Sequence, residues 1–156
     1  TQYGLTLLST AAAYLLGTLL CRRLLARHGL KRTVAIAGLL SASGGLLMLL
    51  AAALGWHSVA ALLPPFYLFM LGHGIHQPCG QSGAVGPFPQ AAGVASALNG
   101  FMMMLAAFAI GRWLGGALDG TVWPLVQGVA LWSLLLAAIA WTLVQRHAPQ
   151  ESADAP

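Results

Sequence analysis

The sequence predicts an all-α protein, a polytopic transmembrane helix bundle, and two observations carry this prediction. Of the 156 residues, 58% are hydrophobic and only 6% are charged, whereas a soluble domain carries roughly a quarter charged residues. In addition, short polar or proline-marked linkers divide the chain into five long apolar segments. Because this composition cannot supply a polar coat, we expect an integral membrane protein with five spans.

The first two predicted spans, residues 3–21 and 33–54, flank a basic loop at residues 22–32. As a helix the first span is about 28 Å long, just enough to cross an apolar layer of about 30 Å. Gly29 is the expected break in the loop, and in the second span small residues allow close helix approach: Ala37, Ser41, Gly44 and Gly45. The loop holds five of the seven lysines and arginines: Arg22, Arg23, Arg27, Lys31 and Arg32. The positive-inside rule places it in the cytoplasm, and the absence of interleaved aromatic residues argues against nucleic-acid binding.

The third predicted span, residues 64–86, opens at Pro64-Pro65 and contains Pro78 in its interior. Pro78 lacks the amide that would bond to the Gly74 carbonyl, so we expect a kink there. Pro87 and Pro89 are expected to end the span in a tight cytoplasmic turn.

The fourth and fifth predicted spans are residues 92–116 and 122–145. A ridge of small residues opens the fourth span and is expected to serve close packing: Gly93, Ser96, Ala97 and Gly100. Residues 146–156 are predicted to be a disordered cytoplasmic tail. The odd number of spans and the start at Thr1 rather than Met lead us to expect a part of a longer protein.

Polar residues cluster between Gly72 and Gly100, where they are costly unless they face protein or a water-filled cavity. The candidates for lining a substrate pathway are His73, His76, Gln77, Gln81 and Asn99. The two histidines share a helix face because they stand three residues apart. They could line a cavity or relay protons, bond between helices, or form half of a soft-metal site with Met102, Met103 and Met104. For the three amides, a polar pathway wall and interhelical bonding remain equally open.

The remaining polar groups suggest no catalytic chemistry. Arg112 is expected to extend to the interface or to pair with Asp119, which is otherwise a turn and cap residue. Cys21 and Cys79 are interpreted as packing residues. Because no nucleophile, base and orienting group occur together, we expect no enzymatic activity. Carboxylates and cysteines at ligand spacing are absent, so we expect no metal, and we also expect no cofactor.

Three short segments resemble the Bcr/CflA group of drug-resistance antiporters within the major facilitator superfamily. They are Gly74-Ile75-His76-Gln77-Pro78, then Pro87-Phe88-Pro89, then the run from Ala92 to Leu98 with Gly100. Residues 17–32 are similar to the superfamily's glycine-to-arginine loop motif, although the motif's aspartate is absent. The resemblance implies that the five spans are helices eight to twelve of a twelve-helix fold.

The resemblance further implies multidrug efflux by proton antiport, with two six-helix halves rocking about a central site. It implies a multi-pass protein of the bacterial inner membrane, whose partners are the lipid bilayer, a drug-like substrate, protons and the missing N-terminal half. Three alternatives remain open: a major facilitator transporter of a sugar or other metabolite, a non-transporting membrane scaffold, and a copper or haem membrane protein.

Overall fold

The computed structural model describes residues 2–147, and every regular element within them is helical. The elements are α1 (Gln2–Ala53), α2 (Val59–Val85), a 3-10 turn (Pro89–Ala91), α3 (Ala92–Ala117), α4 (Trp123–Trp141) and α5 (Leu143–His147). Within this part of the chain, four helical segments are long and apolar enough to cross a membrane: one in α1, α2, α3 with its 3-10 turn, and α4 with α5. The all-α prediction is therefore confirmed, whereas five separate spans and the major facilitator arrangement stay predictions. The predicted tail lies outside the described residues from 148 onward.

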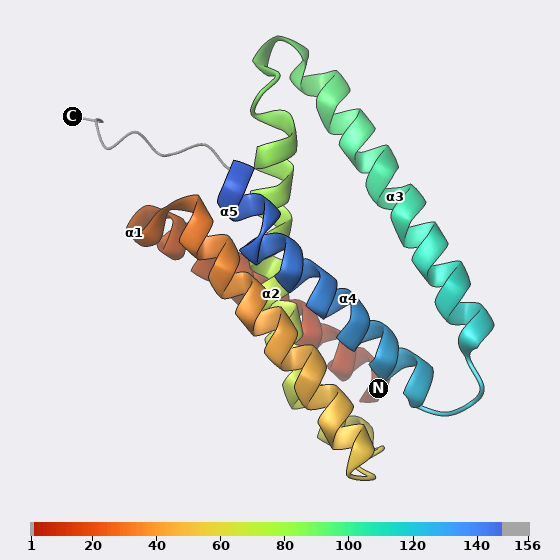
Figure 1. The fold of residues 1–156 in the computed structure, drawn as a ribbon. Coiled ribbons are helices and arrows are strands. Elements are labelled where there is room, and N and C mark those ends of the chain that lie inside the picture. The colour runs from red at the N-terminus through yellow and green to blue at the C-terminus, as the bar shows by residue number, and fades with distance from the viewer. Residues whose placement is uncertain (1, 148–156) are drawn as a thin grey trace.

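The helix α1 is broken at Gly29, whose φ of 69° and ψ of 177° are not helical. In a straight helix Gly17 and Ser41 would be about 36 Å apart, yet both lie against residues 71–74 of α2. The chain therefore reverses at Gly29 into a first arm, residues 2–28, and a second arm, residues 30–53 (Figure 1). The prediction of a non-helical loop at residues 22–32 is therefore wrong: the chain stays helical on both sides of Gly29. The leucine, alanine and arginine residues of this segment favour helix up to Gly29.

The core lies where α2 and α4 pack against α1. The second arm is in contact with both, because a Cβ on Gly44 would lie 2.5 Å from the Phe69 amide nitrogen of α2. A Cβ on Gly38, also in the second arm, would lie 3.1 Å from Ala140 Cβ of α4. One apolar cluster includes Cys21, Val34 and Ile75, and a second at the other end of these helices includes Met48, Leu62 and Val126. Small residues thus set the spacing of the bundle, as is usual for helices in lipid.

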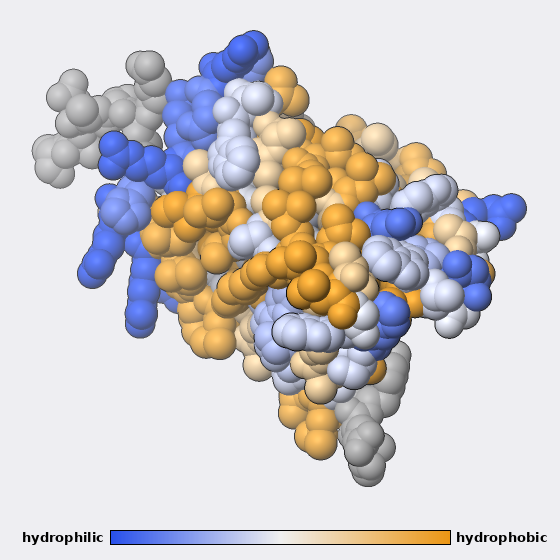
Figure 2. All heavy atoms as spheres, turned by 60° about the horizontal axis from the view of Figure 1, so that its bottom comes forward, coloured by the Kyte–Doolittle hydropathy of each residue, from blue (hydrophilic) through white to orange (hydrophobic). Residues whose placement is uncertain are grey.

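The helix α3 stands apart from this core and joins it only through its two ends (Figure 1). None of its residues is buried. The face of the molecule in Figure 2 is covered by apolar residues at its centre, with hydrophilic residues at the margins. This surface suits an apolar environment rather than water.

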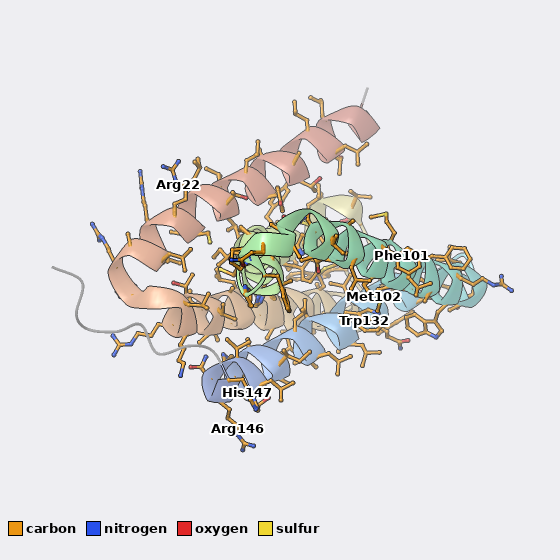
Figure 3. The ribbon with its side chains drawn as sticks, turned by 90° about the horizontal axis from the view of Figure 1, so that it is seen from above. Arg22, Phe101, Met102, Trp132, Arg146 and His147 are labelled. Atoms are coloured by element: carbon orange, nitrogen blue, oxygen red, sulfur yellow. The ribbon has the colours of Figure 1, made fainter. Side chains whose placement is uncertain are left out.

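The basic turn of α1 (residues 22–32, around Gly29), the turn between α2 and α3, and α5 lie at one end of the molecule (Figure 1). Gln145 Nε2 donates to the Lys31 carbonyl at 3.0 Å, which joins α5 to the basic turn. Arg22 and Arg146 point away from the helices at this end (Figure 3). The linkers 54–58 and 118–122 lie at the other end, so the chain alternates between two polar ends.

Two predicted boundaries differ from the structure. The helix α2 begins at Val59 rather than Pro64, because the Ser58 hydroxyl caps it by accepting the Ala61 amide at 3.3 Å. The predicted fifth span, 122–145, is divided between α4 and α5 at Thr142, which is not in a regular helical conformation (φ −116°, ψ −73°). The Thr142 hydroxyl donates to the Ala138 carbonyl at 2.6 Å, a bond that competes with the regular helical ladder.

Candidate functional site

A line of polar contacts joins the first arm of α1 to α2, and we call it the polar seam. Its members are Ser9, Tyr14 and Thr18 of α1 and Tyr67, His73 and Gln77 of α2. Tyr67 Oη donates to Ser9 Oγ at 2.8 Å, and Tyr14 Oη donates to Gln77 Oε1 at 2.6 Å. These bonds place a hydrogen-bonded strip between two otherwise apolar helices.

Glycines bring the two helices close enough for these short side chains to meet. A Cβ on Gly17 would lie 3.1 Å from Gly74 Cα and would collide with the Leu71 carbonyl oxygen. A Cβ on Gly74 would likewise collide with the Tyr14 carbonyl oxygen. Tyr14 and Thr18 are four residues apart and therefore share a helix face. Gly17, three residues after Tyr14, lies on the same side of the helix.

Pro78 leaves an acceptor in α2 without its helical donor, and the Thr18 hydroxyl of the seam, shared with the Tyr14 carbonyl, lies within hydrogen-bond reach of it. Without an amide at Pro78, the Gly74 carbonyl loses its normal helical partner. Thr18 Oγ1 lies 3.3 Å from that carbonyl oxygen and 3.2 Å from the Tyr14 carbonyl oxygen. A threonine hydroxyl from a neighbouring helix is a known substitute for a lost backbone donor in lipid. The helix α2 runs as one element through Pro78, and the predicted kink stays a prediction.

His73 is, with Tyr67, one of the two aromatic members of the seam on α2. Its ring centroid lies 5.7 Å from that of Tyr14 and 6.3 Å from that of Phe69, with the Phe69 and His73 planes only 4° apart. The side chain is half-buried. Phe69 and His73 therefore form a nearly parallel aromatic pair beside the hydrogen bonds of the seam, whereas the Tyr14 ring is tilted by 47° to His73.

His76 lies on a different interface. It is placed against Ala37 of the second arm, and its Nε2 is buried without a hydrogen-bond partner among the described residues. Ser41 Oγ, one helical turn from Ala37, is also buried and unpaired within the same part of the chain. The two histidines predicted to share one face are thus turned toward the two different arms of α1.

Gln81 and Asn99 are not brought into the seam. Gln81 is exposed, and Asn99 lies on α3, where Nδ2 contacts Met103 Sδ at 3.8 Å. The packing ridge of α3 is also uncovered: Ser96 and Ala97 are exposed, and nothing among the described residues lies within 4 Å of a Cβ built on Gly93 or Gly100. Its role in packing stays a prediction.

The soft-metal arrangement considered from the sequence is not assembled here. Met102, Met103 and Met104 are exposed on α3, while both histidines lie on α2. Within residues 2–147 no group of three or more histidine, cysteine or acidic side chains is placed to hold a metal ion. Cys21 and Cys79, by contrast, are brought together: their buried Sγ atoms are 3.6 Å apart between the first arm and α2.

Arg112 and Asp119 do not pair. Arg112 has no ion-pair partner among the described residues. Asp119 Oδ1 accepts the Thr121 hydroxyl at 2.7 Å and the Thr121 amide at 2.9 Å. These bonds hold the pKa of Asp119 below its usual value, and they show the turn role expected as the alternative to the ion pair.

The half of the seam that lies on α1 was not among the residues predicted to line a pathway. Ser9, Tyr14 and Thr18 recur at intervals of five and four residues within the apolar first span. Tyr14 and Thr18, four residues apart and therefore on one helix face, were the available signal.

The fold defines a class: an α-helical protein whose helices have the length and composition of membrane spans. Compared with protein-family models, with curated proteins and with solved structures, the chain matches none. The particular family and activity therefore have to be argued from the residues themselves.

Proposed function

We propose that this chain forms part of a secondary active membrane transporter, most specifically a multidrug efflux protein that exchanges drug for protons by alternating access. The observation that carries the proposal is the polar seam. Polar side chains at membrane depth are costly, and they mark solute or proton pathways by default. The sequence resemblance to the Bcr/CflA group supports the same function.

The chemistry of the seam suits a solute of low charge. Tyr14 and Gln77 are neutral groups that donate and accept hydrogen bonds, and the His73 and Tyr14 rings offer apolar, stacking contact. No lysine, arginine or carboxylate belongs to the seam. Imidazole is also the side chain that most readily exchanges protons near neutral pH, so His73 is the proposed proton-responsive group.

In the proposed transporter the chain works against a second helix bundle, the N-terminal half expected from the resemblance. The exposed helix α3 supports this arrangement, because its small-residue ridge at Gly93, Ser96, Ala97 and Gly100 has no partner within residues 2–147. The concentration of basic residues at one end of the molecule supports a cytoplasmic location for that end. The bacterial inner membrane is the proposed site.

The test is drug flux in energised membrane vesicles that contain the full-length protein. Gln77→Leu should reduce proton-driven efflux about tenfold or more if the Tyr14–Gln77 bond and its pathway are required, whereas Gln81→Leu is the matched control on the same helix, one turn away. Membrane levels of both variants are measured by immunoblot. Equal fluxes for the two variants would remove the seam from the pathway, and no flux above empty vesicles would overturn the transport proposal.

One observation favours a non-transporting scaffold as the second candidate. The Tyr14–Gln77 and Tyr67–Ser9 bonds satisfy their partners within the protein, as expected of groups that only hold helices together. For a scaffold, Gln77→Leu would lower the free energy of unfolding by under about 2 kcal/mol and no solute would move. A metabolite transporter would instead show flux in a sugar and amino-acid panel but not with drugs.

A further inference from the structure

A groove opens between the end of α3 and the start of α4, away from the polar seam. Its volume is about 620 Å³, and its lining includes Trp113, Asp119, Trp123 and Gln127. Its lining residues belong to the last turns of α3, the 118–122 linker and the first half of α4, and that linker lies opposite the basic turn in Figure 1. Its size is that of a small-molecule site.

The two tryptophans are placed by contacts outside the groove. A Cβ built on Gly128 of α4 would lie 3.6 Å from Trp113 Cζ3, so the Trp113 ring spans from α3 to α4 over a position without a side chain. The Trp123 ring lies edge-on to His57, with centroids 6.4 Å apart. Two indole side chains, one from α3 and one from α4, thus line the same groove.

Asp119 supplies the negative charge of this groove. The chain has three acidic residues, and Asp119 is the one that lies within residues 2–147. Glu151 and Asp154 lie outside the described part. Its Oδ1 is fixed by the hydroxyl and amide of Thr121. Arg112 adjoins Trp113 in the sequence but is about 100° around the helix from it, and it does not line the groove.

We propose that this groove binds a lipophilic organic cation, held between the Trp113 and Trp123 faces with its charge near Asp119. Indole is the best aromatic partner for a cation, and a carboxylate beside it selects against neutral molecules of the same shape. A compact inorganic ion would gain little, since most of the lining is aromatic or aliphatic. The proposal concerns equilibrium binding and does not require the transport activity proposed above.

The experiment is equilibrium dialysis of radiolabelled tetraphenylphosphonium against the full chain in lipid nanodiscs, with empty nanodiscs subtracted. Asp119→Asn keeps an oxygen that can accept the Thr121 bonds but removes the charge, and it should weaken binding about fivefold or more. Trp113→Leu should weaken binding about two- to tenfold through the lost cation–π contact. Neutral triphenylphosphine oxide should compete poorly.

Trp132→Leu is the control, because Trp132 lies on α4 but outside the groove. It should bind the probe as the unaltered chain does. Saturable binding that Asp119→Asn and Trp132→Leu leave equally strong would overturn the proposal. So would a complete absence of saturable binding, or equal competition by the neutral analogue. If Trp113→Leu does not fold, the Asp119→Asn result decides alone.

Discussion

At the scale of single residues, Thr18 and Pro78 act together although they belong to different helices. Pro78 removes an amide from α2, and the Thr18 hydroxyl of α1 approaches the carbonyl that this amide would have bonded, at 3.3 Å. An unpaired carbonyl is costly where no water is present. A sequence feature that weakens one helix is therefore offset by a side chain from a distant part of the chain.

Thr18→Val should lower the free energy of unfolding by about 0.5–2 kcal/mol in the unaltered chain. In a Pro78→Ala background, the restored backbone amide bonds to the Gly74 carbonyl, so the same substitution should cost clearly less. The measurement is a double-mutant cycle of unfolding in mixed micelles. An equal cost of Thr18→Val in both backgrounds would show that the two residues are independent.

At the scale of elements, the helices differ sharply in how their small residues are used. In α1 and α2, glycines sit where two backbones touch, and Gly44 lies against the Phe69 amide and the Pro65 carbonyl. In α4 five of the six buried positions, Val126, Ala130, Ser133, Ala137 and Ala140, recur at alternating intervals of four and three, as on a helix face packed against another helix. The sixth is Gly128. In α3 the glycines meet nothing among the described residues.

Gly44→Ala should destabilise the chain by about 1–3 kcal/mol, because the added Cβ would lie 2.5 Å from the Phe69 amide nitrogen and 2.7 Å from the Pro65 carbonyl oxygen. In the chain of residues 1–156 on its own, Gly100→Ala within α3 should be neutral or stabilising by up to about 1 kcal/mol, since alanine favours helix and no neighbour among the described residues is displaced. Thermal unfolding of both variants in detergent compares them. A Gly100→Ala variant as unstable as Gly44→Ala would mean that α3 packs against the core.

The contact between the first arm and α2 also predicts a cross-link. Copper(II)-phenanthroline should convert the Cys21 and Cys79 thiols, 3.6 Å apart, to a disulfide, with two electrons and two protons passing to the oxidant. Mass spectrometry should show a loss of two hydrogens, reversed by dithiothreitol, and none in Cys21→Ala. Free thiols throughout the titration would contradict the close approach of the two helices.

At the scale of the whole molecule, the charges are distributed unequally between the two ends. Six of the seven lysines and arginines lie in the basic turn or at Arg146, and Arg112 alone lies elsewhere, on α3. The positive-inside rule supports our proposal that the end with the basic turn faces the cytoplasm. The turn between α2 and α3 lies at that same end (Figure 1).

Accessible cysteines introduced into a Cys21→Ala, Cys79→Ala background test this orientation. Val59→Cys, at an exposed position beside the 54–58 linker, should react with a membrane-impermeant maleimide in intact bacterial spheroplasts. Gln90→Cys, at the exposed turn between α2 and α3, should react only after permeabilisation. The reverse pattern would invert the proposed topology, and labelling of both positions in intact spheroplasts would contradict a spanning α2.

The helical class, the approximate apolar segments, the break at Gly29 and the turn role of Asp119 could all be predicted from the sequence. These properties follow from local composition, from glycine's freedom to adopt a φ of 69°, and from short-range hydrogen bonding. Which polar residues meet could not be predicted in this way and depends on the packing of the helices. His73 and Gln77 join Tyr14 of α1, His76 turns to the second arm, and Gln81 stays exposed, because contacts between helices rather than spacing along one helix select the partners.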